Sequence, residues 1–171
     1  MNLAYADQFS IEQYGAYKLI TIVDSGRYLL VPKGVSVPAD VPSDIVVLQQ
    51  PLNSIYLVSS SVMDQFVALD ALDSIALSGT RQDGWYIDEA RQAMADGKIT
   101  YAGKYSAPDY ETIYSADCNL AIENTMILHT PEVKEQLEHF GIPVLVERSS
   151  YESDPLARME WIKLYGILLG R

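Results

Sequence analysis

Short apolar segments alternate with helical segments from residue 45 onward, and this alternation limits the fold more than any other feature of the sequence. Six of the segments are expected to be strands: Ile45–Leu48, Ile55–Val58, Ser74–Leu77, Lys98–Tyr101, Leu120–Ile122 and Pro143–Val146. Such short apolar strands are typical of a parallel sheet that helices cover on both faces. The sequence therefore predicts the α/β class, with three α/β/α layers around a mainly parallel central sheet.

Helices are expected between these strands, at Ser60–Leu72, Trp85–Asp96, Asp109–Ala116 and Thr130–Phe140. The clearest start is at Thr130, because a Thr N-cap, a Pro at the first helical position and an acidic residue after it all favour the same boundary. Its buried stripe is expected to consist of Val133, Leu137 and Phe140, and Gly141 ends the helix.

The first 44 residues have a different pattern. Tyr17–Val23 and Arg27–Pro32 are two β-rich segments joined by Asp24-Ser25-Gly26, a short glycine-containing connection of the kind that closes hairpins. Gly34–Asp44 contains two prolines among small and polar residues and is expected to be an irregular surface connection. We therefore expect an N-terminal β-hairpin in front of the central sheet.

A long apolar helix is expected from Asp154-Pro155 to the end of the chain, carrying Met159, Ile162, Leu164 and Leu168. A helix that is apolar on most sides needs more cover than a helix at the surface of a small domain receives. Two alternatives stay open: the helix packs against a segment outside this chain, or it is fully buried within the domain.

Composition excludes several classes of function. The chain has 171 residues, 49% of them hydrophobic, which suffices for a single domain over residues 1–171. The net charge of −11 disfavours nucleic acid and anionic membrane surfaces as partners. The single cysteine, Cys118, excludes an internal disulfide, and two histidines make a zinc site improbable. Met1–Leu3 begins no signal segment, so an export signal is expected to have been removed or never to have existed.

Ligands of an open parallel sheet lie outside the carboxyl ends of its strands. The segments at that edge are expected to be Ser59–Val62, Gly79–Trp85, Gly103–Tyr110, Glu123–His129 and Glu147–Glu152. They supply the predicted ligand contacts, which are Ser60, Arg81, Trp85, Lys104, Tyr105, Asn124, Met126, Arg148 and Tyr151. The alternative is that the aromatic residues cap the core and the basic residues pair with nearby acids.

Catalytic motifs are weaker. The sequence has no phosphate-binding glycine loop, and Ser59-Ser60-Ser61 lacks the glycines of a nucleophile elbow, so a serine helix cap explains it better. His129 and His139 are expected at the surface, and Cys118 in the core. A small enzyme that uses Glu123, Glu147 and Glu152 is the remaining catalytic alternative, which a strongly raised carboxylate pKa in a closed pocket would favour.

Two C-terminal runs carry a family resemblance. The run Thr130–Ser153, followed by Pro155-Leu156 and by Arg158–Leu168, resembles the N-terminal lobe of class III (helical-backbone) solute-binding proteins of ABC importers. Ile55–Gly79 and Leu120–Met126 look like strand and helix segments of the same lobe. Where relatives commonly show His-Pro-Leu-Gly, this chain has Asp154-Pro155-Leu156-Ala157, which puts the function of that loop in doubt.

The resemblance implies a substrate-binding component, not an enzyme. In that family two α/β lobes are joined by a long helix, and the ligand, an iron-siderophore, haem, cobalamin or related metal chelate, lies between them. The chain ends at Arg171, where that helix would be under way, so the second lobe is expected to be absent. No resident cofactor or metal is implied.

The resemblance also implies partners and a location. Family members dock on an ABC permease through acidic side chains, for which Glu132 is the first choice and Glu152 the second. The expected location is extracytoplasmic, as a cell-surface lipoprotein or in the periplasm. The alternative function is a stand-alone regulatory or interaction domain, which forms a homodimer through Trp161–Leu169 of the C-terminal helix.

Overall fold

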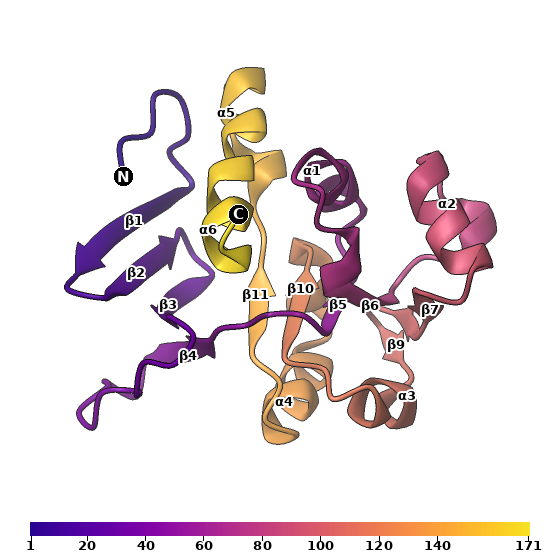
Figure 1. Cartoon of the computed structure of the whole chain (residues 1–171), viewed down its shortest axis with the longest axis horizontal. Helices are drawn as coiled ribbons and strands as arrows, with labels where there is room; N and C mark the ends of the chain where they lie inside the picture. Colours follow the sequence, from indigo (N-terminus) through magenta and orange to yellow (C-terminus); the bar gives the residue numbers. More distant parts are fainter.

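A five-stranded parallel sheet forms the middle of the computed structural model, which describes residues 1–171 (Figure 1). The strand order is β11-β10-β5-β6-β7, and every neighbouring pair is parallel. The strands are β5 (Ile55–Leu57), β6 (Ile75–Ser78), β7 (Thr100–Tyr101), β10 (Leu120–Glu123) and β11 (Val144–Val146). The predicted α/β fold with a mainly parallel central sheet is confirmed.

Helices cover both faces of this sheet. One face packs against α1 (Met63–Ala68), α2 (Asp88–Ala95) and α6 (Ile162–Leu169), and the other against α3 (Tyr110–Ser115) and α4 (Pro131–His139). Successive side chains of a strand point to opposite faces, so Leu57 lies in the first core and Tyr56 in the second. Both faces are therefore apolar, which explains why the strands show no alternation in the sequence.

Each of four central strands leads at its carboxyl end into a short 3-10 helix. These are η1 (Ser60–Val62) after β5, η3 (Gln82–Gly84) after β6, η4 (Thr125–His129) after β10 and η5 (Ser149–Tyr151) after β11. Strand β7 leads instead into a small hairpin of β8 (Gly103–Lys104) and β9 (Ala107–Pro108), and η2 (Leu72–Ser74) precedes β6.

The N-terminal region is a second sheet of four strands. They are β1 (Phe9–Tyr14), β2 (Tyr17–Ile22), β3 (Gly26–Val31) and β4 (Ile45–Gln49). The predicted hairpin is present as β2 and β3. The assignment of Ile45–Leu48 to the central sheet is wrong, because β4 pairs in parallel with β3. A short apolar run predicts a buried strand but does not specify which neighbour it pairs with.

The C-terminal segment differs from the predicted single long helix. It is divided into α5 (Pro155–Glu160) and α6, with Trp161 between them. Asp154 caps α5, since its carboxylate accepts a hydrogen bond of 2.7 Å from the amide of Leu156. Met159, expected on the apolar side, is 62% exposed.

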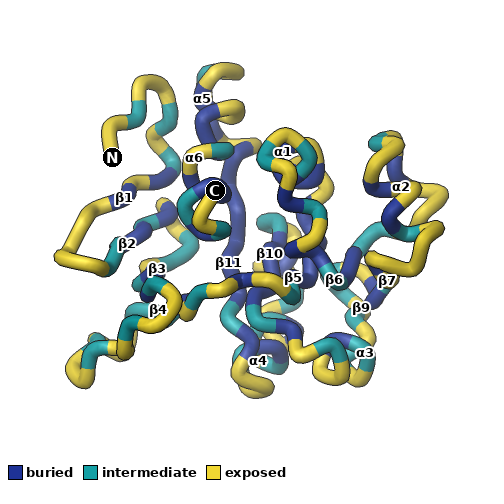
Figure 2. Tube along the Cα trace, in the orientation of Figure 1, coloured by how far each residue is buried: buried dark blue, intermediate teal, exposed yellow.

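The N-terminal sheet supplies the cover that the terminal helix needs. Trp161, Leu164, Tyr165 and Leu168 are buried, and the Trp161 ring lies 4.8 Å from that of Phe9 on β1. In Figures 1 and 2 the helix lies between the two sheets. Of the two alternatives, burial within the chain is what the structure shows, and a homodimer through this helix receives no support.

Glu160 binds residues 4–6 near the start of the chain to α5. Its carboxylate accepts hydrogen bonds from the amides of Ala4, Tyr5 and Ala6 and one of 2.6 Å from Lys163. The Lys163 bond, followed by the amide bonds, lowers the pKa of Glu160 to about 2. The start of the chain is thus tied to a helix that is distant from it in the sequence.

Several predicted helix details are corrected. The segment after Ser60 is η1 and α1, which end at Ala68 and not at Leu72, and α2 begins at Asp88 and not at Trp85. No serine side chain caps η1, and Thr130 occupies the N-cap of α4 without a capping hydrogen bond, because its hydroxyl donates to the carbonyl of Ile127. Phe140 is 39% exposed and not part of the buried stripe. None of the helices has the length and apolar character needed to cross a bilayer.

Candidate functional site

The parallel direction of the five central strands brings their carboxyl ends to one edge of the sheet, here called the rim. The predicted ligand contacts Ser60, Lys104, Asn124 and Arg148 follow strands β5, β7, β10 and β11. The topology therefore gathers residues from four separate segments at the same edge.

A buried network joins the ends of β5 and β11. Glu147 is 3% exposed, and its Oε1 accepts hydrogen bonds from the hydroxyls of Ser59 at 2.7 Å and Ser61 at 2.9 Å. Its Oε2 accepts one of 2.8 Å from the amide of Ser149. Ser60 and Ser61 are both exposed, but only the hydroxyl of Ser61 is bound to Glu147. The triple serine is therefore explained by Glu147, a partner that sequence reasoning did not find.

Arg148 lies at the end of β11 and is 9% exposed. Its guanidinium stacks on the ring of Tyr151 at 4.1 Å and lies 3.6 Å from a carboxylate oxygen of Asp24. Asp24 belongs to the turn between β2 and β3, so the N-terminal sheet also reaches the rim. The sequence showed this turn as a hairpin connection but gave no signal that it lies beside Arg148.

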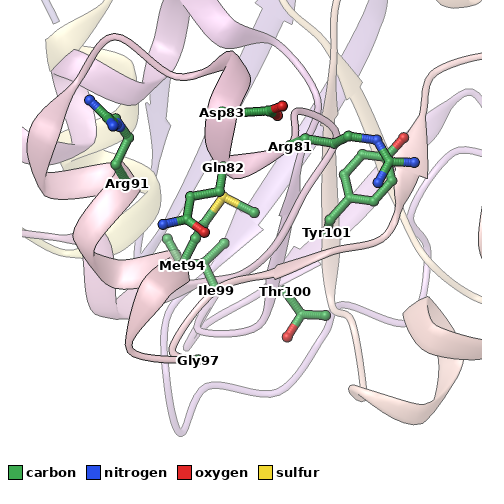
Figure 3. A pocket seen from close by; sticks show the side chains of 9 residues that line it. All are labelled: Arg81, Gln82, Asp83, Arg91, Met94, Gly97, Ile99, Thr100 and Tyr101. Carbon is green, nitrogen blue, oxygen red and sulfur yellow. The ribbon is translucent and has the colours of Figure 1, made fainter.

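Arg81 and Trp85 follow β6 but differ in access. The guanidinium of the exposed Arg81 lies over the ring of Tyr101 at 4.3 Å. A hollow of about 600 Å³ runs beside them, with Arg81 and Tyr101 at one side and Arg91 at the other (Figure 3). Trp85 is 5% exposed and donates from its indole nitrogen to Ser78 Oγ at 3.2 Å. Trp85 is therefore a core residue, as the alternative for the aromatic residues stated.

The remaining predicted contacts lie on the β8–β9 hairpin and on η4. Lys104 is exposed, and Tyr105 is half-buried against the second core. The side-chain oxygen of Asn124 accepts a hydrogen bond of 2.9 Å from the amide of Met126 and so caps η4. This cap leaves Met126 45% exposed at the rim.

Glu123 is the last residue of β10 and is completely buried, with no partner for either carboxylate oxygen. Val146 lies beside it in the sheet. Loss of hydration raises its pKa to about 8, so Glu123 is mostly neutral at pH 7. A raised carboxylate pKa is one of the two conditions set for the enzyme alternative.

The second condition is a closed pocket, whereas both carboxylate oxygens of Glu123 are covered by protein. Five surface hollows have volumes of about 290 to 780 Å³, and none is lined by Glu123, Glu147 or Glu152.

The chain has no group of three or more His, Cys, Asp or Glu side chains that is able to hold a metal ion. Cys118 lies in the second core, and its burial raises the pKa of the thiol.

The two predicted docking acids lie in different environments. Glu132 is exposed in the first turn of α4. Glu152 is 4% exposed and accepts hydrogen bonds from the amides of Asp7 and Gln8 and from the indole of Trp161. Its carboxylate is thus fully engaged inside the chain, which leaves Glu132 as the exposed acid of the two.

Comparisons with known proteins agree with this architecture. No family model matches the chain. An uncharacterized lipoprotein of Methanocaldococcus jannaschii is 23% identical over 96% of this chain and 43% of the relative. The haem-binding periplasmic protein HutB of Vibrio cholerae superposes with a TM-score of 0.51 and 16% identity, over 68% of this chain and 40% of HutB.

A periplasmic binding protein from Veillonella parvula superposes with a TM-score of 0.53 and 13% identity, over 95% of this chain and 46% of that protein. The chain therefore spans less than half the length of each of the three proteins. At these identities the superpositions establish the fold alone, an α/β arrangement that the chain shares with part of each of these two proteins.

Proposed function

We propose that the chain is the N-terminal lobe of a class III solute-binding protein, which presents a metal chelate to an ABC permease. The observation that carries this proposal is the rim, where segments from all five parallel strands meet at one open edge. Ser60, Arg81 and Lys104 are exposed there, without an enclosing second wall. An open surface of this kind is suited to form half of a cleft.

The side chains of the rim favour a bulky anionic ligand. Arg81, Lys104 and Arg148 are basic although the whole chain has a net charge of −11. Met126 and Tyr151, which also follow strands of the central sheet, add exposed apolar and aromatic area, and Tyr151 contacts Arg148. Aromatic rings provide large contact area at low entropic cost, and arginine binds carboxylate or catecholate oxygens through two hydrogen bonds. Ferric siderophores, haem and cobalamin derivatives are the ligand classes we propose.

Titration of the chain with ferric siderophores, haem and cobalamin, followed by tryptophan fluorescence and calorimetry, tests the proposal. We expect dissociation constants weaker than micromolar, because half a cleft must offset several kcal/mol of lost rigid-body freedom without the second wall. Arg81→Ala should weaken binding further, whereas Arg91→Ala, at the other side of the same hollow, should not. Micromolar or tighter binding, or equal effects of the two variants, would contradict the half-site.

Docking on the permease is proposed for Glu132, which is exposed at the start of α4. Glu135 lies on the same helix, is also exposed and is the matched control. Glu132→Ala should reduce the stimulation of the importer's ATPase by the full-length binding protein, and Glu135→Ala should not.

An extracytoplasmic location is also proposed, partly because a relative is named as a lipoprotein. Fractionation of cells that express the full reading frame tests this location.

A further inference from the structure

The corner where the β2–β3 turn meets the end of β11 has more hydrogen-bond donors than acceptors. Arg148 is 9% exposed, and its Nε has no hydrogen-bond partner. The hydroxyl of Ser25, next to Asp24 in the turn, is also buried and without a partner. The one acid that reaches Arg148 is Asp24, at 3.6 Å, which is too long for a direct hydrogen bond.

Asp24 is held weakly compared with its partner. Its side chain is 77% exposed, whereas that of Arg148 is 11% exposed. The backbone φ of Asp24 is 52°, in the left-handed region, so the turn conformation and not packing places its carboxylate beside the arginine. An exposed carboxylate in a long ion pair contributes little binding energy and is readily replaced by a better acceptor.

The stacking of Arg148 on Tyr151 keeps the guanidinium ready for such an acceptor. The guanidinium carbon lies 4.1 Å from the centre of the ring, so the ring contacts the face of the group and not its edge. Nε is covered by protein, and the Nη groups, one of which faces Asp24, are the donors that a ligand reaches first. Burial lowers the effective dielectric constant around the charge, which strengthens its attraction to an anion. Arg81 and Lys104 are exposed and lack this advantage.

We propose that this corner is an anion subsite of the rim for a carboxylate group of the ligand, and that Asp24 is an internal counter-ion which the ligand displaces. The inference rests on the proposed function of the rim and adds a chemical class of ligand and a residue that competes with it. Removing the competing carboxylate should therefore strengthen the binding of carboxylates, although the removed group faces the site.

Citrate, titrated at constant ionic strength, is a suitable probe, with NMR of the arginine Nε–Hε and backbone amide signals as the readout. The variants are Asp24→Asn and, as a matched control, Asp44→Asn. Asn tolerates a left-handed backbone as Asp does, so the turn is preserved. Asp44 forms a comparable exposed ion pair with Arg27 on the same sheet, and its substitution changes the net charge equally.

We expect citrate to shift the Arg148 and Ser25 signals, and Asp24→Asn to raise citrate affinity on the order of five- to tenfold. Asp44→Asn should leave the affinity unchanged. Adding Arg148→Lys to Asp24→Asn keeps the positive charge but removes the bidentate hydrogen-bond donor. The citrate affinity of this double variant should therefore return to the wild-type level or below. A thermal melt of each variant checks that it is folded.

The subsite would be overturned if Asp24→Asn and Asp44→Asn changed the citrate affinity equally. It would also be overturned if citrate shifted NMR signals but not those of Arg148. Its failure is distinguishable from failure of the proposed function. If metal chelates bind and neither Asp24→Asn nor Arg148→Lys changes their affinity, the subsite is wrong and the receptor function stands. If no chelate binds but citrate behaves as expected, the subsite stands and the metal-chelate class is wrong.

Discussion

The ends of β10 and β11 lie side by side in the sheet, yet they treat a buried carboxyl group in opposite ways. At the end of β11, Glu147 accepts hydrogen bonds from two serine hydroxyls and one amide. At the end of β10, Glu123 is buried even more completely and accepts none. Both carboxyl groups are buried, and the number of hydrogen-bond donors around them differs.

The comparison shows which part of the rim responds to pH. Three hydrogen-bond donors surround the carboxylate of Glu147, so hydrogen bonds hold this side of the rim together. Glu123 has no donors, and loss of hydration raises its pKa to about 8. The end of β10 therefore contains an acid that is mostly neutral at pH 7 and becomes charged in slightly alkaline solution.

The largest expected effect is the pH dependence that Glu123 imposes on stability. Its pKa is higher in the folded chain than in the unfolded chain, so its stabilising contribution is complete below about pH 4 and is lost as the pH rises through 8. Gln imitates the neutral acid. We expect Glu123→Gln to match the wild type near pH 5 and to exceed its free energy of unfolding by about 3 kcal/mol at pH 8.

Urea unfolding of both proteins at pH 5 and pH 8 measures this difference, and the contributions of all other groups cancel between them. Glu135→Gln, a change of the same charge at an exposed position, is the control and should show no such gain. If the wild type and Glu123→Gln lose stability in parallel from pH 5 to pH 8, the contrast between the two strand ends is wrong.

The next effect tests the partnered side. Glu147→Ala removes the acceptor of two serine hydroxyls and of the amide of Ser149. One hydroxyl is able to donate to the other at 3.0 Å, so two donors lose their acceptor. We expect a loss of about 2 to 3 kcal/mol in the free energy of unfolding at pH 7. Urea unfolding is again the measurement, with Glu135→Ala as the exposed control. A loss no greater than that of the control would mean that the network does not stabilise the rim.

The smallest expected effect is the difference in stability between Ser61→Ala and Ser60→Ala. Ser61→Ala removes one of the two hydroxyls that Glu147 accepts and should cost about 1 kcal/mol. Ser60→Ala, at the exposed serine between the two partners, should change the free energy of unfolding by less than about 0.5 kcal/mol. Thermal unfolding of the two variants side by side gives the ranking, and a reversed ranking would show that Ser60 is the structural residue.

The central layer of the fold could be predicted because its signal is local. Ile55–Leu57, Leu120–Glu123 and Val144–Val146 are short apolar runs separated by helices, and such runs indicate strands wherever they occur. Strand β4 has the same local pattern and was placed in the wrong sheet. Its partner is β3, and pairing depends on contacts that an isolated run does not encode.

The site was predictable to the same extent. The rim follows from topology alone, since the carboxyl ends of parallel strands must share an edge, and this brought Ser60, Lys104 and Arg148 together. The exposure of individual side chains at the rim did not follow from the topology. Glu152 and Trp85 have residue types common at binding surfaces, but one is bound by backbone amides from the start of the chain and the other by Ser78.

The sequence by itself determined the α/β class, the parallel direction of the central strands and the edge at which functional side chains collect, because each depends on patterns within about ten residues. Only the tertiary structure decided that the N-terminal sheet covers the last helix, that Asp24 reaches Arg148, and that Glu147 finds donors while Glu123 finds none. The physical reason is that burial and hydrogen bonding of a side chain depend on groups that the fold brings near it from distant parts of the chain.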